Sequence, residues 1–482
     1  MKQKWIMQLE AGKAPLFLRI GKAITDAIKD GRLIAGDALP STRALATQLE
    51  VHRKTVVAAY SELEREGWLA TKAAVGTFVS LDLPLVEATS RGRKERRRAG
   101  FDLPARVAPQ SAKSPRTRLL LLGGLPEIKL LPRAELARAY RRALLSATGR
   151  ELLDYGSPQG DERLRTTVSE MLRQTRGIAV APEALNIVRG TQQGLYLTAR
   201  ALLEPGDRVA IEAYSHPAAR GALQIAGAVL LPVPVDEAGL DVEALEALCD
   251  KVPIKAVCVT PHHQLPTTVT MSAARRMALL ALARRRRLLI LEDDYDYEFQ
   301  YEGRPVLPLA HSDRAGVVVY FGSLSKVLAP GLRVGFVAST RDVAERIAQY
   351  RAFVDQQGDR VVERAVGELI ETGELDRHTR RLRRVYCERR DVLAQAITRY
   401  LPALTFAPPR GGLAIWARTP GIDADAWAER SLRENVSFQA ASHFAYGRMP
   451  LDGVRLGFAV CNPSQLVEAV QGMARALRLC RD

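Results

Sequence analysis

Short β-rich runs alternate with helical stretches over about 365 residues of this chain, from residue 118 to its end. Helical stretches such as AARRMALLALARRR separate runs such as DRVAIEAY and KAVCVTP. This alternation is typical of a parallel sheet with helices on its faces, in which ligands bind at the carboxyl ends of the strands. We therefore predict an α/β domain over residues 118–482. The six clearest runs are residues 207–214, 228–235, 255–261, 287–299, 316–325 and 332–339.

The first 80 residues have a different and shorter pattern. Apolar residues recur at helical spacing in three stretches, residues 16–28, 41–49 and 52–66, and Gly67 follows the third stretch. Residues 69–80 then have the composition of two short strands joined near Gly76. Three helices followed by a hairpin predict a winged helix-turn-helix over residues 1–80.

In such a module the third helix presents its N-terminal residues to the major groove of DNA. Here that end reads HRKT, in which arginine suits guanine and phosphate alike and the hydroxyl suits phosphate. The alternative is a helical protein-interaction domain with a solvated charged face. The predicted DNA contacts are Ser41, Thr42, Arg43, His52, Arg53, Lys54, Thr55, Lys72 and Gly76.

Residues 31–80, which begin GRLIAGDALPSTRALATQLEVHRKTVVAAY, resemble the winged-helix domain of the GntR family of bacterial repressors. The resemblance implies operator DNA as a partner. It also implies that Arg43, Arg53 and the following Lys54–Thr55 are the operator contacts.

Positive charge is concentrated in the first quarter of the chain. Residues 1–118 hold 22 Lys and Arg against 12 Asp and Glu, which is +10 of the total net charge of +16. Residues 81–117 are rich in Arg, Pro and Ser and poor in large apolar side chains, so we predict a flexible basic linker there. Its run Arg91–Arg98 either follows DNA phosphates or is a solvated spacer.

Five cysteines are scattered without a CxxC pair, at Cys249, Cys258, Cys387, Cys461 and Cys480. This spacing argues against a zinc site or a disulfide scaffold and favours a reduced, cytoplasmic protein. We predict no membrane segment, because no apolar run approaches the length needed to span a bilayer.

Four motifs at strand ends point to one chemistry. In GSLSKVLAPGLRVG, a single lysine, Lys326, follows an apolar strand, and a desolvated lysine with a lowered pKa forms Schiff bases with aldehydes. In LLILEDDYDYEF, an acidic cluster ends a buried strand. Asp293 there suits the ring nitrogen of pyridoxal phosphate, with Tyr295 on the ring hydroxyl, whereas a divalent metal is the alternative for such a cluster. Arg455, alone in the apolar strand VRLGFAV, suits an effector carboxylate.

The fourth motif, GTQQ, lies at a helix start, where backbone N–H groups and the helix dipole bind phosphate. A phosphate dianion also suits the hydroxyls and the arginine that flank Lys326. The predicted phosphate-binding and neighbouring residues are Gly190, Thr191, Gln192, Ser323, Ser325 and Arg333.

The order of these motifs resembles that of fold-type-I aminotransferases. More closely, GGLPEIKLLPRAELARAYRRAL, YGSPQGDERLRTTVSEMLRQTRGI and RHTRRLRRVYCERRDVL resemble MocR/GabR-type regulators, a GntR subfamily. The resemblance implies a winged helix-turn-helix (α+β) linked to a large α/β, pyridoxal-phosphate-dependent, aminotransferase-like domain with a smaller C-terminal α+β subdomain. It implies that Lys326 forms the internal aldimine and that Asp293 and Tyr295 hold the ring. Tyr155 would reach the cofactor of the partner subunit in a head-to-tail homodimer.

Three positions depart from the pattern of that subfamily. His216 stands where a tyrosine usually stacks on the ring, with Tyr214 nearby as a substitute. Thr268 replaces a usual glycine in a loop where His263 and Gln264 are the expected ring-side contacts. Ala414 replaces a frequent histidine.

We predict a cytoplasmic, pyridoxal-phosphate-dependent transcriptional regulator that senses an amino compound, or pyridoxal phosphate itself, through aldimine chemistry at Lys326. The alternatives are an active aminotransferase with an accessory DNA-binding domain, and a DNA-binding protein whose second domain binds no cofactor. In the favoured reading the aminotransferase-like domain has at most weak transaminase activity.

Overall fold

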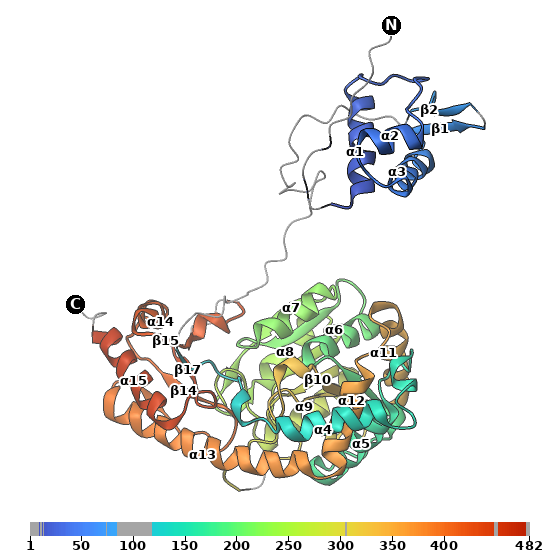
Figure 1. Ribbon diagram of the computed structural model, residues 1–482. Helices are drawn as coiled ribbons and strands as arrows, with labels where there is room; N and C mark the ends of the chain where they lie inside the picture. The colour runs from blue at the N-terminus through green and yellow to red at the C-terminus, as the bar shows by residue number, and fades with distance from the viewer. Residues whose placement is uncertain are drawn as a thin grey trace. The chain divides into compact units, whose positions relative to one another are not determined.

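A computed structural model describes residues 9, 12, 14–73, 75–83, 118–303, 306–447 and 452–478. The chain forms two compact units, Met1–Val107 and Ala108–Asp482, and each is described by itself (Figure 1). Most of the predicted linker, including its run Arg91–Arg98, lies outside the described residues, as does Cys480. Among the described residues, none of the helices has the length and apolar character needed to cross a membrane.

The N-terminal unit contains three helices followed by a two-stranded antiparallel sheet, in which Leu69 pairs with Val79. Its core forms where the apolar faces of the helices meet, around Ile24, Leu45 and Val56. The Tyr60 hydroxyl donates a hydrogen bond of 2.8 Å to the Pro40 carbonyl oxygen and so ties the third helix to the second. The elements are α1 (Leu16–Lys29), α2 (Thr42–Gln48), α3 (Arg53–Arg65), β1 (Leu69–Lys72) and β2 (Gly76–Val79).

The second unit is built on a seven-stranded sheet in the order β4-β12-β11-β10-β9-β5-β6. All six predicted runs form strands of this sheet, and β4 adds a seventh that the sequence patterns did not reveal. The strands are β4 (Leu185–Val188), β5 (Arg208–Glu212), β6 (Val229–Val233), β9 (Ala256–Val259), β10 (Leu289–Asp294), β11 (Val318–Ser323) and β12 (Gly335–Ala338).

One strand departs from the predicted parallel arrangement. β12 pairs antiparallel with both β11 and β4, whereas β11, β10, β9, β5 and β6 are mutually parallel. The reason is the connection 324–334, which is too short for the crossover helix that a parallel pair requires. This same connection carries Lys326.

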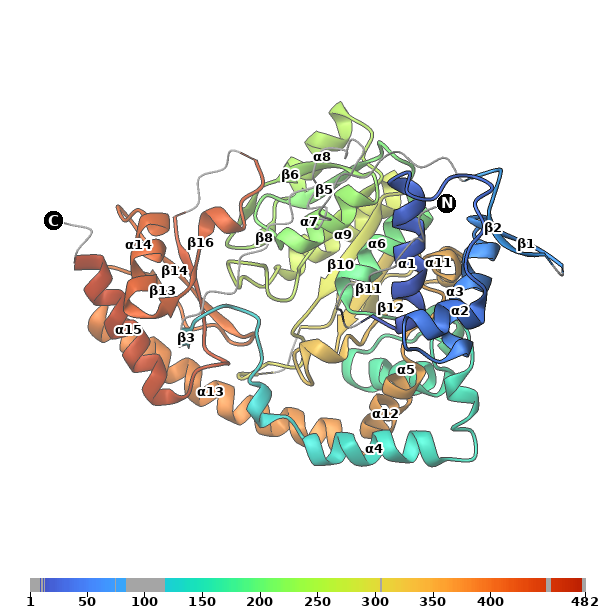
Figure 2. The ribbon, with the colours of Figure 1, turned by 45° about the horizontal axis from the view of Figure 1, so that its top comes forward.

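Helices cover both faces of the sheet because successive strand residues point to opposite sides. Val257 packs in the core beneath α8 (Val242–Lys251) and α9 (Ala273–Arg286), whereas Cys258 packs in the core beneath α6 (Thr191–Leu202) and α7 (Pro217–Ile225). Figure 2 shows the strands between these layers. Beside the sheet, α5 (Glu162–Arg176) and α11 (Arg341–Val354) contact β4, and α10 (Leu309–Ser312) contacts β11. The helices α4 (Arg133–Leu145) and α12 (Arg360–Glu371) pack on each other.

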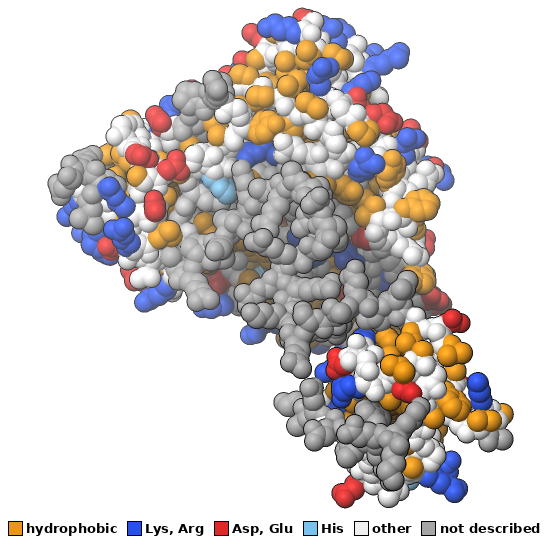
Figure 3. Space-filling model, turned by 90° about the horizontal axis from the view of Figure 1, so that it is seen from above, with side chains coloured by type: hydrophobic (Ala, Val, Ile, Leu, Met, Phe, Trp, Pro, Cys, Tyr) orange, Lys and Arg blue, Asp and Glu red, His pale blue; other side chains and the backbone are white. Residues whose placement is uncertain are grey.

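A smaller subdomain follows the long helix α13 (Glu374–Tyr400). Its four-stranded antiparallel sheet has the order β13-β14-β17-β16 and packs against α13 and the C-terminal helix. The elements are β13 (Thr405–Phe406), β14 (Ala414–Arg418), α14 (Ala424–Ser431), β16 (Gln439–Ala440), β17 (Val454–Gly457) and α15 (Pro463–Arg478). On the face drawn in Figure 3, basic side chains are scattered among acidic and hydrophobic ones.

Candidate functional site

A cavity of about 180 Å³ lies where β10 and β11 end and where α6 and α7 begin. The sequence-predicted residues Asp293, Tyr295, Ser323, Ser325, Lys326, Arg333, Gly190, Thr191, Gln192 and His216 all line it. Three of the four motifs, which are far apart in the chain, therefore converge on one space, whereas Arg455 of the motif VRLGFAV is not among the lining residues.

Lys326 projects from the tight connection between β11 and β12. Leu324 N–H donates to the Val334 carbonyl oxygen at 3.2 Å, and Leu328 N–H donates to the Leu324 carbonyl oxygen at 2.8 Å. Burial lowers the pKa of Lys326, and the charges of Asp296 and Asp293 oppose that shift. Desolvation thus favours the neutral, nucleophilic amine.

Asp293 is the member of the acidic cluster that faces the cavity. Its Oδ1 is buried and has no hydrogen-bond partner among the described residues. Burial, together with the negative charge of Asp294, raises its pKa from 3.8 to about 7, while Lys326 opposes the rise. A buried carboxyl oxygen without a partner is costly, so this position suits a ligand that brings a hydrogen-bond donor.

Each of the other acidic residues of the cluster has a protein partner on at least one oxygen, although Asp294 Oδ1 and Asp296 Oδ2 are also buried without a partner among the described residues. Tyr320 donates to Asp294 at 2.8 Å, and His263 Nδ1 lies 2.8 Å from Asp296 Oδ1. Glu292 accepts from the backbone of Leu309 and Ala310. Among the described residues, no group of three His, Cys, Asp or Glu is arranged to hold a metal ion.

The opposite end of the cavity is suited to an anion. Gly190 is the N-cap of α6 with φ 81°, and no side chain caps the helix. A side chain at Gly190 would come within 3.2 Å of Arg333 Nη2, so glycine lets the guanidinium lie against the helix start. Arg333 itself has φ 53° and donates to the Arg189 carbonyl oxygen at 2.5 Å. Ser325 N–H donates to Ser323 Oγ at 3.2 Å, which orders the two hydroxyls beside Lys326.

His216 lines the cavity at the N-terminus of α7. Its Nδ1 accepts a hydrogen bond of 3.1 Å from Ala218 N–H, so the ring acts as the N-cap of this helix. Crowding by protein atoms, followed by the charges of Lys326 and neighbouring cations, lowers its pKa, although the side chain is exposed to solvent at one side. The imidazole is therefore neutral at neutral pH and its orientation is fixed by α7.

Tyr295 and Arg455 connect the cavity to the small subdomain. The Tyr295 hydroxyl donates to the His263 carbonyl oxygen at 2.9 Å, and Arg455 Nη2 lies 3.5 Å from the same hydroxyl. Arg455 Nη1 donates to the Pro266 carbonyl oxygen at 2.8 Å, and its Nε has no partner among the described residues. Arg455 lies behind the cavity wall, because Gly123 packs directly on its guanidinium.

Besides Arg455, three predicted residues lie away from the cavity lining. Gln264 Nε2 donates to the Tyr214 carbonyl oxygen at 2.7 Å, and its Oε1 accepts from Thr267, so it holds its own loop together. His263 is occupied by Asp296. Tyr155 lies on another segment, 78% exposed.

Several residues of the site were missed in the sequence. Gly123 and Gly124 line the cavity, and a side chain at Gly124 would come within 3.7 Å of Lys326 Nζ. Thr260 also lines it, and its hydroxyl donates at 2.6 Å to buried Glu212. The pair of glycines after a short strand is the sequence signal that could have found Gly123 and Gly124. The remaining missed lining residues are Leu195, Ala218, Ala219, Leu265 and Pro330.

The predicted DNA contacts lie at three places in the N-terminal unit: the start of α3, the start of α2 and the β1–β2 hairpin. His52 caps α3 through Lys54 N–H, and Arg53 Nε donates to Thr42 Oγ1 at 3.3 Å. Ser41 Oγ accepts from Ala44 N–H and so caps α2. Lys72 Nζ lies over the Phe78 ring. Thr42 and Thr55 are half-buried, whereas Ser41, Arg43, His52, Arg53, Lys54, Lys72 and Gly76 are exposed.

The chain matches two families over these two units. Residues 16–79 match the bacterial regulatory proteins of the gntR family, and residues 129–473 match the class I and II aminotransferases.

Similar proteins include regulators and an enzyme. The chain is 30% identical to the probable rhizopine catabolism regulatory protein MocR of Rhizobium meliloti, over 96% of this chain and 94% of that protein. It is 32% identical to the transcriptional regulator TauR of Rhodobacter capsulatus, over 97% of both chains. The structure of α-aminoadipate aminotransferase from Thermus thermophilus, complexed with N-(5'-phosphopyridoxyl)-L-leucine, is 31% identical, with a TM-score of 0.70 over 76% of this chain and 93% of the enzyme.

Proposed function

Since this chain belongs to the MocR/GabR-type transcriptional regulators, in which a gntR-family winged helix precedes a class I and II aminotransferase domain, we propose that it senses an amino compound at Lys326. Binding of that compound changes the affinity of the winged helix for operator DNA. The observation that carries this proposal is the shared cavity of a desolvated lysine and a partnerless buried carboxylate, Lys326 and Asp293.

Pyridoxal 5'-phosphate is the cofactor of this aminotransferase-like domain, and the cavity residues fit it. Asp293 Oδ1 has no hydrogen-bond donor among the described residues, and a protonated ring nitrogen would supply one. The open N-terminus of α6, with Thr191 and Arg333, provides donors for a phosphate. When bound, the cofactor supplies an aldehyde that reacts reversibly with primary amines.

Three side chains of this chain have separate roles at the site. Lys326 offers a neutral amine because its burial disfavours the ammonium form. His216, fixed by the N-terminus of α7, offers a flat neutral ring to the cavity. Arg455 offers a cation for the carboxylate of an amino acid, once the segment at Gly123 moves off its guanidinium.

When the amine of the effector takes the place of the Lys326 amine, the contacts of the 324–334 connection change. A ligand shifts the equilibrium between two conformations only by its difference in affinity for them. We therefore infer that the amine-bound and lysine-bound states differ in the position of this connection and of the Arg455 strand β17.

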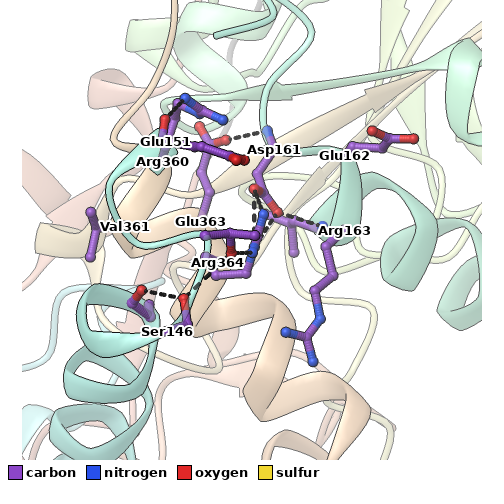
Figure 4. A network of polar contacts seen from close by, with 12 residues as sticks. Ser146, Glu151, Asp161, Glu162, Arg163, Arg360, Val361, Glu363 and Arg364 are labelled. Carbon is purple, nitrogen blue, oxygen red and sulfur yellow. Dashed lines mark hydrogen bonds and ion pairs between the residues drawn. The ribbon is translucent and has the colours of Figure 1, made fainter. Parts of the chain in front are cut away.

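We also infer that the protein acts in the cytoplasm as a head-to-tail homodimer, with Tyr155 near the cofactor of the partner subunit. The loop before α5 that carries Tyr155 is pinned from within: Arg364 Nη2 donates to Asp161 Oδ2 at 2.8 Å, and Glu363 Oε2 accepts from Asp161 N–H at 2.7 Å (Figure 4). Arg360 donates to the Glu151 carbonyl oxygen on the same loop. An exposed tyrosine on a pinned loop suits contact with a second copy, which sedimentation of the wild type and of Tyr155→Ala tests.

The test of sensing is an operator-binding titration of the loaded protein with a panel of amines and amino acids. The proposal requires at least one amine to change the affinity for the promoter that the protein regulates. If neither any amine nor removal of the cofactor changes that affinity, the sensing role is wrong.

A second candidate, transaminase turnover, is favoured by the complete Lys326–Asp293–Arg333 constellation of the cavity. Conversion of the bound cofactor to its amine form changes its absorption spectrum. We expect at most slow conversion, whereas rapid repeated turnover with an amino acid and a keto acid would establish an enzyme.

A further inference from the structure

The helix α3 of the N-terminal unit carries one exposed aliphatic side chain, Val57. Its exposed fraction is 41%, and among the residues of α3, all of which the structure describes, it is the only large hydrophobic side chain outside the core. The buried face of the helix is formed by Val56, Ala59, Tyr60 and Leu63. A single exposed valine is common on protein surfaces, so it is the location of Val57 that distinguishes it.

Val57 lies on a strip of α3 that is held at both ends by neighbouring elements. One turn before it, Arg53 Nε donates to Thr42 Oγ1, at the start of α2, at 3.3 Å. Two turns after it, Glu64 Oε1 accepts at 3.0 Å from Thr71 N–H of β1. Residues four and seven positions apart share one face of an α-helix, so Arg53, Val57 and Glu64 lie along a single strip.

This strip lies between the three places of the unit where DNA contacts are predicted. The start of α3 forms one end of the strip, the start of α2 is bonded to that end, and the β1–β2 hairpin is bonded to the other. A duplex that receives α3 in its major groove, and whose backbone meets α2 and the hairpin, therefore covers Val57.

The chemistry of valine restricts what Val57 can recognise on DNA. Its side chain has neither a hydrogen-bond donor nor an acceptor, and among the base edges of the major groove only the C5-methyl group of thymine is apolar. Over any other base edge, Val57 would displace water from polar groups without replacing their hydrogen bonds, which is unfavourable. Contact with a thymine methyl group instead removes apolar surface of both partners from water.

We propose that Val57 recognises a thymine of the operator through its C5-methyl group. The helical rise between Arg53 and Val57 is about 6 Å, which corresponds to about two base-pair steps of the duplex. The thymine therefore lies within about two base pairs of the position that Arg53 contacts. The charged residues at the start of α3 supply affinity for DNA, whereas Val57 supplies discrimination between bases.

The test requires a DNA site and a way to remove one methyl group from it. The site is selected from duplexes with a random central segment by the full-length protein loaded with pyridoxal phosphate. Each thymine of the selected site is then replaced in turn by deoxyuridine, which lacks only the C5-methyl group. Fluorescence anisotropy at one fixed salt concentration measures the affinity. We expect at least one thymine at which deoxyuridine weakens binding of the wild type about fourfold, the effect of one buried methyl group.

The variant Val57→Ala shows whether this methyl effect belongs to Val57. It should bind the selected site more weakly than the wild type does, and deoxyuridine at the sensitive thymine should lower its affinity by less than about twofold. The salt dependence of binding should be unchanged, because the substitution removes no charge. The matched control is Leu18→Ala, which truncates a 46% exposed aliphatic side chain of α1 and should behave as the wild type with both duplexes.

Three results would overturn the proposal. These are a wild type that tolerates deoxyuridine at every thymine, an equal loss of affinity in the wild type and Val57→Ala, and a Val57→Ala variant that binds the selected site as tightly as the wild type. No amine is added in these titrations, so their outcome is independent of the sensing role proposed for Lys326.

Discussion

Arg455, on β17 of the small subdomain, lies with its Nη2 3.5 Å from the hydroxyl of Tyr295, which follows β10 of the large sheet. The same two side chains bind one loop: Tyr295 donates to the His263 carbonyl oxygen and Arg455 to the Pro266 carbonyl oxygen. The proposed effector residue and the proposed cofactor residue are thus held by a common element. A ligand that draws Arg455 away releases one of the bonds that fix this loop.

Replacing Arg455 should weaken the binding of amino acids but not the binding of amines that lack a carboxylate. Without the guanidinium, Arg455→Gln should bind amino acids about 30-fold more weakly, because a charge-assisted bond to the carboxylate is lost. Amines that lack a carboxylate should bind with unchanged affinity. Absorbance titration of the loaded variant measures both, and a parallel loss for the two ligand classes would show that Arg455 has only a structural role.

The raised pKa of Asp293 predicts a pH-dependent stability of the cofactor-free protein. In the folded state this carboxyl has a pKa of about 7, against an ordinary value of 3.8. Between these values the folded state holds a proton that the unfolded state has lost, so the contribution of Asp293 to stability is full below pH 3.8 and is lost as the pH rises to about 7.

Asp293→Asn removes this contribution. The free energy of unfolding of the variant relative to wild type should therefore improve between pH 4 and pH 8, by on the order of 3 kcal/mol. Urea unfolding of both cofactor-free proteins at the two pH values measures the difference. A constant difference between variant and wild type would show that Asp293 is ionised throughout. The same variant should retain pyridoxal phosphate less well, since its amide is no counter-charge for a ring nitrogen.

Thr268 is a residue in a conformation that favours glycine. Its φ of 62° is left-handed, and a β-branched residue there is strained by about 1–2 kcal/mol. Thr268→Gly should raise the free energy of unfolding by about 0.5 kcal/mol, because the greater freedom of glycine in the unfolded chain offsets part of the relief. As a contrast, Thr267→Gly should destabilise the protein, since Thr267 Oγ1 donates to Gln264 Oε1 at 2.6 Å. Thermal unfolding of Thr268→Gly and Thr267→Gly measures both effects. A Thr268→Gly variant less stable than Thr267→Gly would contradict the strain argument.

Arg53, at the start of α3, should matter for operator binding more than Arg65 at the end of the same helix. Both side chains are exposed, but Arg65 is paired with Glu62. Arg53→Ala should weaken operator binding by about tenfold and reduce the salt dependence of binding by about one counterion. Arg65→Ala should change neither. Equal losses of operator affinity in a fluorescence-anisotropy titration would show that the DNA contacts are not concentrated at the N-terminus of α3.

The sequence was most informative where chemistry requires a particular residue type next to a strand end. Lys326 was found because a lysine is costly beside a buried strand unless a ligand uses it. Asp293 and Arg333 were found because the ring nitrogen and the phosphate of the cofactor need a carboxylate and a cation. Backbone and loop geometry were less predictable. The antiparallel direction of β12 follows from the shortness of the 324–334 connection, which hydrophobic patterning alone does not reveal.

Side-chain direction within loops could not be predicted at all. His263 and Gln264 directly precede Leu265, which lines the cavity, yet their side chains bond to Asp296 and to the Tyr214 carbonyl oxygen instead. Gly123 contributes by lacking a side chain, which lets the backbone pack on Arg455, and the glycine pair alone does not name that partner. These contacts join segments that are 33, 50 and more than 300 residues apart in the chain.

The central claim is that the amine of Lys326 is the switch, and Lys326→Ala tests it most directly. Operator affinity is measured for wild type and variant, both with bound pyridoxal phosphate, with and without the amine to which the wild type responds. We predict that the variant binds operator but that the amine no longer changes its affinity. A normal amine response in Lys326→Ala would contradict the account.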